Sequence, residues 1–314
     1  CVTAPGDNLE QARERAYAAV DRIEWNGKFC RRDIGVREEA RRELLGEPEL
    51  CLRAFAETGS TFTSLVPTHY EMMLEVRGKA GDLGRVEKLM VSSAPARVET
   101  KRRVMEMFPN SGLFELYGST EAGWVTMLHP SEQFDHLGSV GREVVGSLPI
   151  RLLDDAGEEV PDGIPGELYS CGPYSFDGYW NRPDETAKVM TDDGYFRSGD
   201  MGFMDESGYT KIVDRKKDMI LVSGFNVYPN EIEEVAVSHP GVAEAAAVAV
   251  PDEHSGEAVK LFVVRSDPSL SEEELQAFCR ENLTGYKRPR QIQFIRELPK
   301  SNVGKILRRE LRES

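Results

Sequence analysis

The feature that most constrains the fold is a change near residue 130 in the spacing of apolar and turn-forming residues. From residue 49 to residue 130, apolar residues alternate between helical spacing and the short runs typical of strands. Such alternation favours an α/β layer with parallel strands, because helices supply the crossover connections. We expect helices at 49–57, 69–76 and 98–108, and strands at 62–66, 88–91 and 113–116.

From about residue 137 to residue 213, turn-forming residues recur every few positions. Two of these turns are DDAG at 154–157 and DDG at 192–194, and short apolar segments such as 150–153 lie between the turns. Short strands separated by regular turns are typical of antiparallel hairpins. This part of the chain is therefore expected to form a small barrel or a distorted antiparallel sheet.

The last hundred residues return to a mixed pattern that predicts a compact α+β lobe. The run SEEE at 271–274 is a capping box, which predicts a helix ending near Asn282. A further helix is expected at 230–238, with strands at 243–250, 258–264 and 291–295. The predicted fold class is thus α/β and α+β.

The first 46 residues stand apart from the rest. A helix is predicted at 8–21, where Asn8 can cap a segment with its apolar residues on one side. A strongly charged stretch at 37–43 follows, and the run GEP at 46–48 then breaks the pattern. We place a domain boundary here. The chain opens on Cys1 without a signal-peptide pattern, which suggests an internal start.

The charge and cysteine content exclude several classes of function. The formal net charge is −15, so we expect no nucleic-acid partner, because binding phosphates requires a surplus of lysine and arginine. The longest apolar run, 245–250, is far shorter than the about 18 residues of a membrane-spanning helix, so no transmembrane segment is expected. The 5 cysteines form no CxxC pair, which favours reduced thiols and a cytoplasmic location.

The run YGSTE at residues 117–121 is the first motif with chemical content. Gly118 allows close approach of the backbone to a ligand, and the Thr120 hydroxyl can bind a phosphate oxygen. The Glu121 carboxylate can hold Mg²⁺, which prefers oxygen ligands and often keeps a phosphate as co-ligand. A strand-to-helix turn with a capping threonine explains the same residues equally well.

Four further motifs each allow a functional and a structural interpretation. Asp200, within FRSGD at 196–200, can accept hydrogen bonds from a ribose diol, or can simply form an Asx-turn. Lys305 can neutralise carboxylate and phosphate oxygens together, or can merely solubilise its loop. The run DRKKD at 214–218 can be a solvated charged turn, and Gly224 lies before an expected helix start that needs only capping.

The order and spacing of these motifs resemble the adenylate-forming superfamily of acyl-CoA synthetases, nonribosomal-peptide adenylation domains and luciferases. The resemblance runs from about residue 50 to the end. It implies a truncated adenylate-forming large domain at 47–213, with a β-rich subdomain at 137–213, and a C-terminal α+β lid at 214–314. The runs GYWNRPDET at 178–186 and SGFNVYPNEIE at 223–233 look most like fatty-acyl-CoA synthetases.

The resemblance also implies roles for single residues. Lys305 would be the catalytic lysine of adenylation, and Lys217 would lie at the hinge of the lid. Thr120 would contact the AMP phosphate and Glu121 the Mg²⁺. The remaining positions are nucleotide-binding residues and the pantetheine path of coenzyme A: Ala94, Pro95, Tyr117, Gly118, Asp200 and Arg215 for the nucleotide, Gly224 and Phe225 for coenzyme A.

The implied reaction joins a carboxylic acid to coenzyme A at the expense of ATP. The carboxylate attacks the α-phosphate of ATP to give acyl-AMP and pyrophosphate, and the coenzyme A thiol then displaces AMP. Mg²⁺ and Lys305 would stabilise charge in the first step. The lid would then rotate about Lys217 and admit coenzyme A.

The sequence departs from the family in one important segment. The Ser/Thr/Gly-rich loop that ends in lysine and wraps the β and γ phosphates is missing, and the nearest composition, GSTFTS at 59–64, has no lysine. We therefore expect weak or no adenylation by this chain. The alternatives are a non-catalytic remnant that binds AMP or coenzyme A weakly, and an adenylation domain that loads a carrier protein.

Two expectations concern the ends of the matched region. Residues 1–46 resemble the C-terminal tail of phosphoribosylamine–glycine ligase, without its ATP-binding lobes. A large domain that lacks its N-terminal sheet would also expose a strand edge, so we expect self-association.

Overall fold

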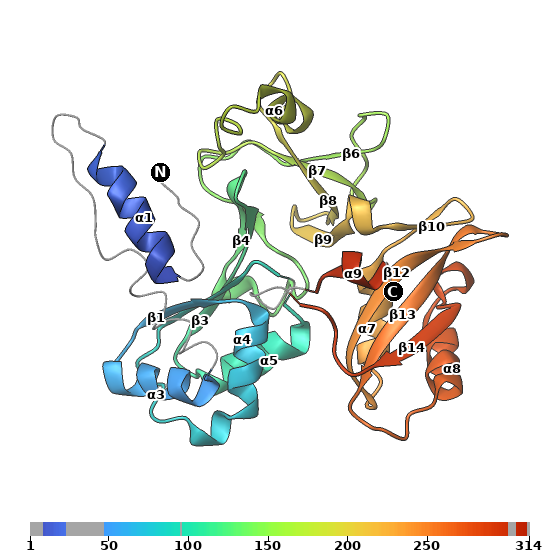
Figure 1. Cartoon of the computed structure of the whole chain (residues 1–314), viewed down its shortest axis with the longest axis horizontal. Helices are drawn as coiled ribbons and strands as arrows, with labels where there is room; N and C mark the ends of the chain where they lie inside the picture. The colour runs from blue at the N-terminus through green and yellow to red at the C-terminus, as the bar shows by residue number, and fades with distance from the viewer. Residues whose placement is uncertain (1–8, 23–46, 95, 301–305, 313–314) are drawn as a thin grey trace.

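The computed structural model describes residues 9–22, 47–94, 96–300 and 306–312 (Figure 1). Helix α1 (Leu9–Asp21) confirms the first predicted helix. Asn8, its predicted cap, and the charged stretch at 37–43 lie outside the described residues. Within the described part of the chain, no helix combines the length and the apolar content needed to cross a membrane.

The first sheet confirms the predicted α/β layer. Its strands follow the order β1 (Phe62–Leu65), β2 (Lys88–Ser92), β3 (Gly112–Ser119), β4 (Gly123–Leu128) and β5 (Arg142–Glu143). The first three strands run parallel, and β4 and β5 continue the sheet antiparallel. Helix α3 (Pro48–Thr58) precedes β1, and the connections carry α4 (Pro67–Glu75), α5 (Val98–Met107) and the short helices η1 (Arg77–Lys79) and η2 (Pro130–Glu132).

A shared core holds these helices on the parallel strands. Leu52, Tyr70 and Phe108 from the helical segments pack with Leu89 and Leu113 of β2 and β3. The Tyr70 hydroxyl donates a hydrogen bond to the carbonyl of Met90 at 3.0 Å, so its polar end is satisfied inside the core.

The second sheet is antiparallel throughout, as the recurring turns predicted. It contains β6 (Arg151–Leu153), β7 (Gly166–Ser170), β8 (Phe196–Met204) and β9 (Thr210–Arg215) in that order. Because β6 and β9 remain its two edges, the sheet is open, and the barrel alternative is wrong. The distorted sheet is the correct prediction, since register shifts interrupt both the β7–β8 and the β8–β9 pairs.

The second sheet packs against the hairpin formed by β3 and β4. Ala122 and Val125 from that hairpin share a core with Leu152, Leu168 and Phe196. Helix α6 (Pro183–Val189) lies in the connection between β7 and β8. This packing brings the end of β3 beside β8, although more than 70 residues separate them.

The third sheet forms a C-terminal lobe with its own core, drawn in orange and red in Figure 1. Its strands follow the order β11 (Phe225–Val227), β10 (Ile220–Val222), β13 (Gly256–Arg265) and β12 (Val242–Asp252), and β14 (Gln291–Ile295) pairs with β13. The helical segments are α7 (Pro229–Val237), α8 (Glu272–Asn282), α9 (Arg308–Arg312), η3 (Lys216–Asp218) and η4 (Gly285–Lys287). Ser271 caps α8 by accepting the amide of Glu274 at 3.1 Å.

Candidate functional site

The YGSTE run forms the tight end of a β-hairpin. Strand β3 ends at Ser119, and the chain turns directly into antiparallel β4, so the strand-to-helix alternative is wrong. Ser119 closes the turn by accepting the amide of Ala122 at 3.0 Å. A Cβ atom at Gly118 would collide with the carbonyl oxygen of Gly123. The two strands therefore require glycine at position 118 for their own close approach.

Tyr117, Asp200 and Arg215 form one hydrogen-bonded cluster beside this hairpin. The Tyr117 hydroxyl donates to Asp200 Oδ2 at 2.6 Å, and Arg215 Nη1 donates to Asp200 Oδ1 at 2.7 Å. Asp200 and Arg215 are direct partners across β8 and β9. The structure thus brings together, from three different strands, three of the residues for which the resemblance implied nucleotide binding.

A bulge in β8 turns Asp200 toward this cluster. Arg197 and Met201 pair with Tyr169 and Glu167, so three residues of β8 lie opposite Leu168 alone. Ser198 stabilises the bulge, because its hydroxyl donates to the Leu168 carbonyl at 2.7 Å and accepts the Asp200 amide at 3.0 Å. The segment belongs to strand β8, so the Asx-turn alternative is wrong.

The cluster is polar and partly open to solvent. The side chain of Asp200 is 12% exposed and that of Arg215 is 38% exposed. Burial, and then the charge of Asp200, raise the pKa of Tyr117 well above its ordinary value, so its hydroxyl stays protonated and remains a donor. Each Asp200 oxygen keeps room for a second donor. The carboxylate can therefore accept hydrogen bonds from a ligand diol.

The turn residues Thr120 and Glu121 lie next to the cluster along the chain. Thr120 is exposed at the tip of the hairpin. The Glu121 carboxylate accepts a hydrogen bond from the Tyr179 hydroxyl at 2.9 Å, and its backbone carbonyl accepts the amide of Phe176 at 2.7 Å. This contact was not predictable from the sequence, because 58 residues separate Tyr179 from Glu121 and no periodic pattern links the two.

The donor set around Glu121 fits Mg²⁺ but not a metal that needs several protein ligands. Over the described ranges, no group of three His, Cys, Asp or Glu side chains could hold a metal ion. Mg²⁺ is often bound through one or two carboxylates, with phosphate oxygens and water as the other ligands. A single glutamate on an exposed turn is compatible with that mode of binding.

The predicted adenine and hinge residues lie on other segments. Ala94 lies in the bend that follows β2, after Ser93 with its positive φ of 71°. Lys217 lies exposed in η3, directly after β9 and therefore close to Arg215 along the chain. Pro95 and Lys305 lie outside the described residues.

Gly224 and Phe225 belong to a hairpin in the C-terminal lobe. Ser223 and Gly224 connect β10 to β11 with φ values of 51° and 83°, the geometry of a two-residue type I′ turn. Gly224 therefore shapes a hairpin rather than a helix start, and helix capping does not explain it, since α7 begins at Pro229. The exposed Phe225 ring stacks on Tyr286, with ring centroids 4.8 Å apart.

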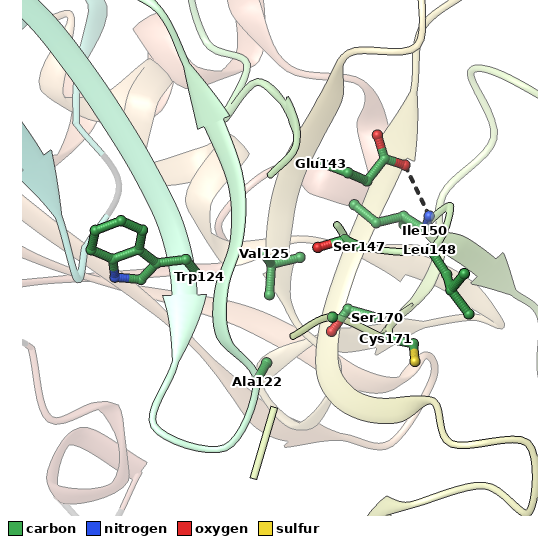
Figure 2. A pocket seen from close by; sticks show the side chains of 10 residues that line it. Ala122, Trp124, Val125, Glu143, Ser147, Leu148, Ile150, Ser170 and Cys171 are labelled. Carbon is green, nitrogen blue, oxygen red and sulfur yellow. Dashed lines mark hydrogen bonds between the residues drawn. The ribbon is translucent and has the colours of Figure 1, made fainter. Parts of the chain in front are cut away.

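A shallow pocket lies beside the hairpin and contains none of the predicted site residues. Figure 2 shows Val125 of β4 pointing toward Ser147, Ser170 and Cys171, whereas the ring of Trp124 points away from them. Among the described residues, the buried hydroxyl oxygens of Ser147 and Ser170 have no hydrogen-bond partner. The pocket borders the core that β4 shares with the second sheet, and its lining includes none of Tyr117, Asp200 and Arg215.

Sequence comparisons agree with the motif order described above. Residues 33–180 match the family of AMP-binding enzymes, and residues 231–305 match the AMP-binding enzyme C-terminal domain. The chain belongs to the AMP-binding enzyme family. Residues 1–37 match the C domain of phosphoribosylglycinamide synthetase, which confirms the separate resemblance at the start of the chain.

Several members of the family are closely similar to parts of this chain. A long-chain-fatty-acid–CoA ligase of Escherichia coli is 57% identical over 201 residues, which are 64% of this chain and 36% of that protein. The amide bond synthetase McbA from Marinactinospora thermotolerans has a TM-score of 0.78 at 32% identity, covering 85% of this chain and 54% of the synthetase. The chain thus spans about a third to a half of the length of these relatives.

A third relative was solved with a reaction intermediate. The o-succinylbenzoate CoA synthetase from Bacillus subtilis, in complex with its acyl-adenylate intermediate OSB-AMP, has a TM-score of 0.77 at 28% identity. The alignment covers 85% of this chain and 54% of that synthetase. These likenesses confirm the predicted adenylate-forming fold.

Proposed function

We propose that this chain is part of an AMP-forming acid–CoA ligase whose acid is a fatty acid. The observation that carries the proposal is the cluster in which Asp200 accepts hydrogen bonds from both Tyr117 and Arg215 at the end of the YGSTE hairpin. Family membership supports an adenylate-forming reaction, and the similarity to long-chain-fatty-acid–CoA ligases supports the choice of acid.

In this proposal Asp200 and Arg215 bind the ribose of ATP, and Tyr117 fixes the orientation of the Asp200 carboxylate. Gly118 and Thr120 lie near the phosphates, and Glu121 holds Mg²⁺, which would neutralise phosphate charge when bound. The adenine lies near Ala94 and Pro95. The acid carboxylate attacks the α-phosphate and pyrophosphate leaves, while the Lys305 ammonium stabilises the developing charge.

The second step requires a different arrangement of the same chain. We propose that residues 47–213 are the partial large domain, that 214–314 are a lid, and that 1–46 are a separate tail. The lid turns about Lys217, and the coenzyme A thiol then displaces AMP along a path lined by Gly224 and Phe225. A hinge at a single exposed residue can absorb the required change of backbone angles.

A second candidate is a non-catalytic relative that binds AMP or coenzyme A weakly. The sequence feature that favours it is GSTFTS at 59–64, whose composition comes nearest to the family's phosphate loop but which has no lysine. A third candidate, an adenylation domain that loads a carrier protein, uses the same first step and differs only in the thiol that accepts the acyl group.

Acid-dependent exchange of pyrophosphate into ATP separates these candidates. An acid–CoA ligase is expected to show exchange with long-chain fatty acids, and Lys305→Ala is expected to abolish it. AMP binding without exchange would favour the non-catalytic relative. Transfer to a carrier protein but not to coenzyme A would favour the adenylation domain. Binding of neither AMP nor coenzyme A would contradict the ligase and the non-catalytic relative alike.

Two further properties belong to the same proposal. We propose a cytoplasmic location, which the free thiols of Cys51, Cys171 and Cys279 support.

We also propose self-association through the first sheet, in which β1 is an edge strand and Phe62 is 51% exposed. Sizing chromatography tests this property, and a concentration-independent monomer would contradict it.

A further inference from the structure

Asn230, at the start of α7, joins the C-terminal lobe to the strand that carries Arg215. Its backbone amide donates to Asp214 Oδ2 at 2.9 Å, and its side-chain Nδ2 donates to the Val213 carbonyl at 2.9 Å. Val213 and Asp214 directly precede Arg215 in β9, and all three lie before Lys217, so they stay with the second sheet when the chain turns at Lys217. One residue of the lobe therefore makes two hydrogen bonds beside the proposed ribose site.

The side-chain oxygen of Asn230 is also hydrogen-bonded, which fixes the orientation of its side-chain amide. Oδ1 of Asn230 accepts a hydrogen bond from Arg308 Nη2 at 2.8 Å. Arg308 is itself held by both oxygens of Glu233, at 2.9 and 2.8 Å from Nη2. Since Arg308 belongs to α9 and Glu233 to α7, the lobe presents Asn230 in a rigid setting.

Asp214 makes separation of the lobe from β9 costly. The residue is buried, and burial raises the pKa of its carboxyl, although the Asn230 amide and the Arg308 charge oppose that effect. If the lobe turned away, Asp214 would lose the Asn230 amide and the nearby Arg308 charge. A buried carboxylate that loses its partners is strongly disfavoured.

The residues on either side of Lys217 are held by different parts of the molecule. Lys216 binds Asp155 at 2.7 Å and Glu167 at 2.9 Å, both in the second-sheet region. Asp218 binds Arg312 of α9 at 2.7 Å. The backbone between these ion pairs is therefore the place where the lobe can turn, and the bonds of Asn230 oppose that turn.

We propose that Asn230 is a positioning residue that holds the C-terminal lobe in the orientation described here, through its hydrogen bonds to Val213 and Asp214. This inference rests on the proposed function only in assigning the lobe rotation to the second step. The orientation itself can be measured without any substrate.

The decisive variant is Asn230→Asp. Aspartate in the first turn of a helix favours the helix dipole, so α7 should remain folded. The substitution removes the donor to Val213 and places a second carboxylate beside Asp214. A purely structural role for Asn230 would tolerate the change, whereas a positioning role would not. Asn230→Ala removes the same donor without adding charge. Asn282→Ala is the matched control, since the side chain of Asn282 donates its hydrogen bond within α8, to the Phe278 carbonyl.

The measurement is the distance between two dyes on unnatural residues at the exposed positions Asp162 and Glu273, in the full chain. We expect one narrow distance population for the wild type and for Asn282→Ala. Asn230→Ala keeps the backbone amide that binds Asp214 and loses the side-chain bond to Val213, so the ratio of the two lobe orientations should shift by about tenfold, as expected for the loss of one hydrogen bond. Asn230→Asp should shift it further.

Two outcomes separate this inference from the proposed function. A single unchanged distance in both Asn230 variants, with α7 intact by circular dichroism, would overturn the positioning role even if pyrophosphate exchange is robust. A changed distance in a chain that shows no exchange and no AMP binding would support the positioning role and contradict the proposed ligase.

Discussion

Two charged clusters attached to strand β3 differ in almost every physical property. Glu115 pairs with Lys101 of α5 at 2.7 Å, and the two side chains are 8% and 1% exposed. Tyr117, two residues further along the same face of the strand, binds Asp200, whose partner Arg215 is 38% exposed. The first pair is closed inside the fold, whereas the second is open to a ligand.

The positions of the two residues along β3 explain the difference. Glu115 lies in the middle of the sheet, in register with Val91 of β2 and Leu128 of β4, and α5 covers it. Tyr117 lies near the end of the strand, where a register shift and the hairpin turn open the sheet. In parallel sheets, ligands bind beyond the carboxyl ends of the strands. The buried Lys101–Glu115 pair thus belongs to the core, and the half-open cluster of Tyr117, Asp200 and Arg215 is the candidate site.

The largest effect is expected for Lys101→Met. Removal of the lysine leaves Glu115 buried without a counter-charge, and the free energy of unfolding at neutral pH should fall by about 3–5 kcal/mol. Urea unfolding followed by circular dichroism measures this loss. The double variant Lys101→Met with Glu115→Leu should recover most of it, because no buried charge remains. A loss below about 1 kcal/mol, the median for exposed pairs, would contradict a closed pair.

The same variant should show a distinctive dependence on pH. Burial raises the pKa of Glu115, and Lys101 opposes that rise, so the pKa should climb further when Lys101 is removed. An acid with a raised pKa in the folded state contributes its stability below the unfolded pKa and loses it as pH rises through the folded pKa. The deficit of Lys101→Met should therefore shrink as pH falls from 7 toward 5, and a widening deficit would contradict this assignment.

An intermediate effect is expected for Asp200→Asn on AMP binding. The carboxylate would lose its charge-assisted hydrogen bonds to the ribose, so the affinity for AMP should fall by about 1.5–3 kcal/mol, or roughly ten- to a hundredfold. Isothermal titration calorimetry measures the change. Asp252→Asn is the matched control, since Asp252 accepts hydrogen bonds from Ser255 within its own turn. Equal AMP affinities in both variants and the wild type would remove Asp200 from the nucleotide site.

The smallest effect is expected for Tyr117→Phe. The substitution removes one hydrogen bond to Asp200, while Arg215 still holds the other oxygen of that carboxylate. The free energy of unfolding should fall by about 0.5–1.5 kcal/mol. Thermal unfolding, with Tyr70→Phe as a buried tyrosine control, measures it. If Tyr117→Phe costs as much as Lys101→Met, the proposed difference between the closed and the open cluster is wrong.

Local sequence determined the elements of this fold. The spacing of apolar residues predicted the helices at 49–57 and 98–108 and the strands at 62–66, 88–91 and 113–116, and the structure confirms all of these as α3, α5 and β1–β3. Helix and strand periodicity depends on neighbouring residues only, so it is readable without the fold. The order of the motifs likewise predicted the family, because that order is itself a property of the sequence.

Tertiary structure alone decided which residues meet. Nothing in the sequence predicted that Tyr179 would bind Glu121, that Lys101 would bind Glu115, or that Asn230 would bind Asp214. The sequence also left open whether the second sheet would close into a barrel. These outcomes depend on how sheets and helices pack over long chain separations, and on shape rather than periodicity. The sequence by itself therefore determined the family and the helices and strands. Only the folded chain decided that Tyr117, Asp200 and Arg215 form one cluster.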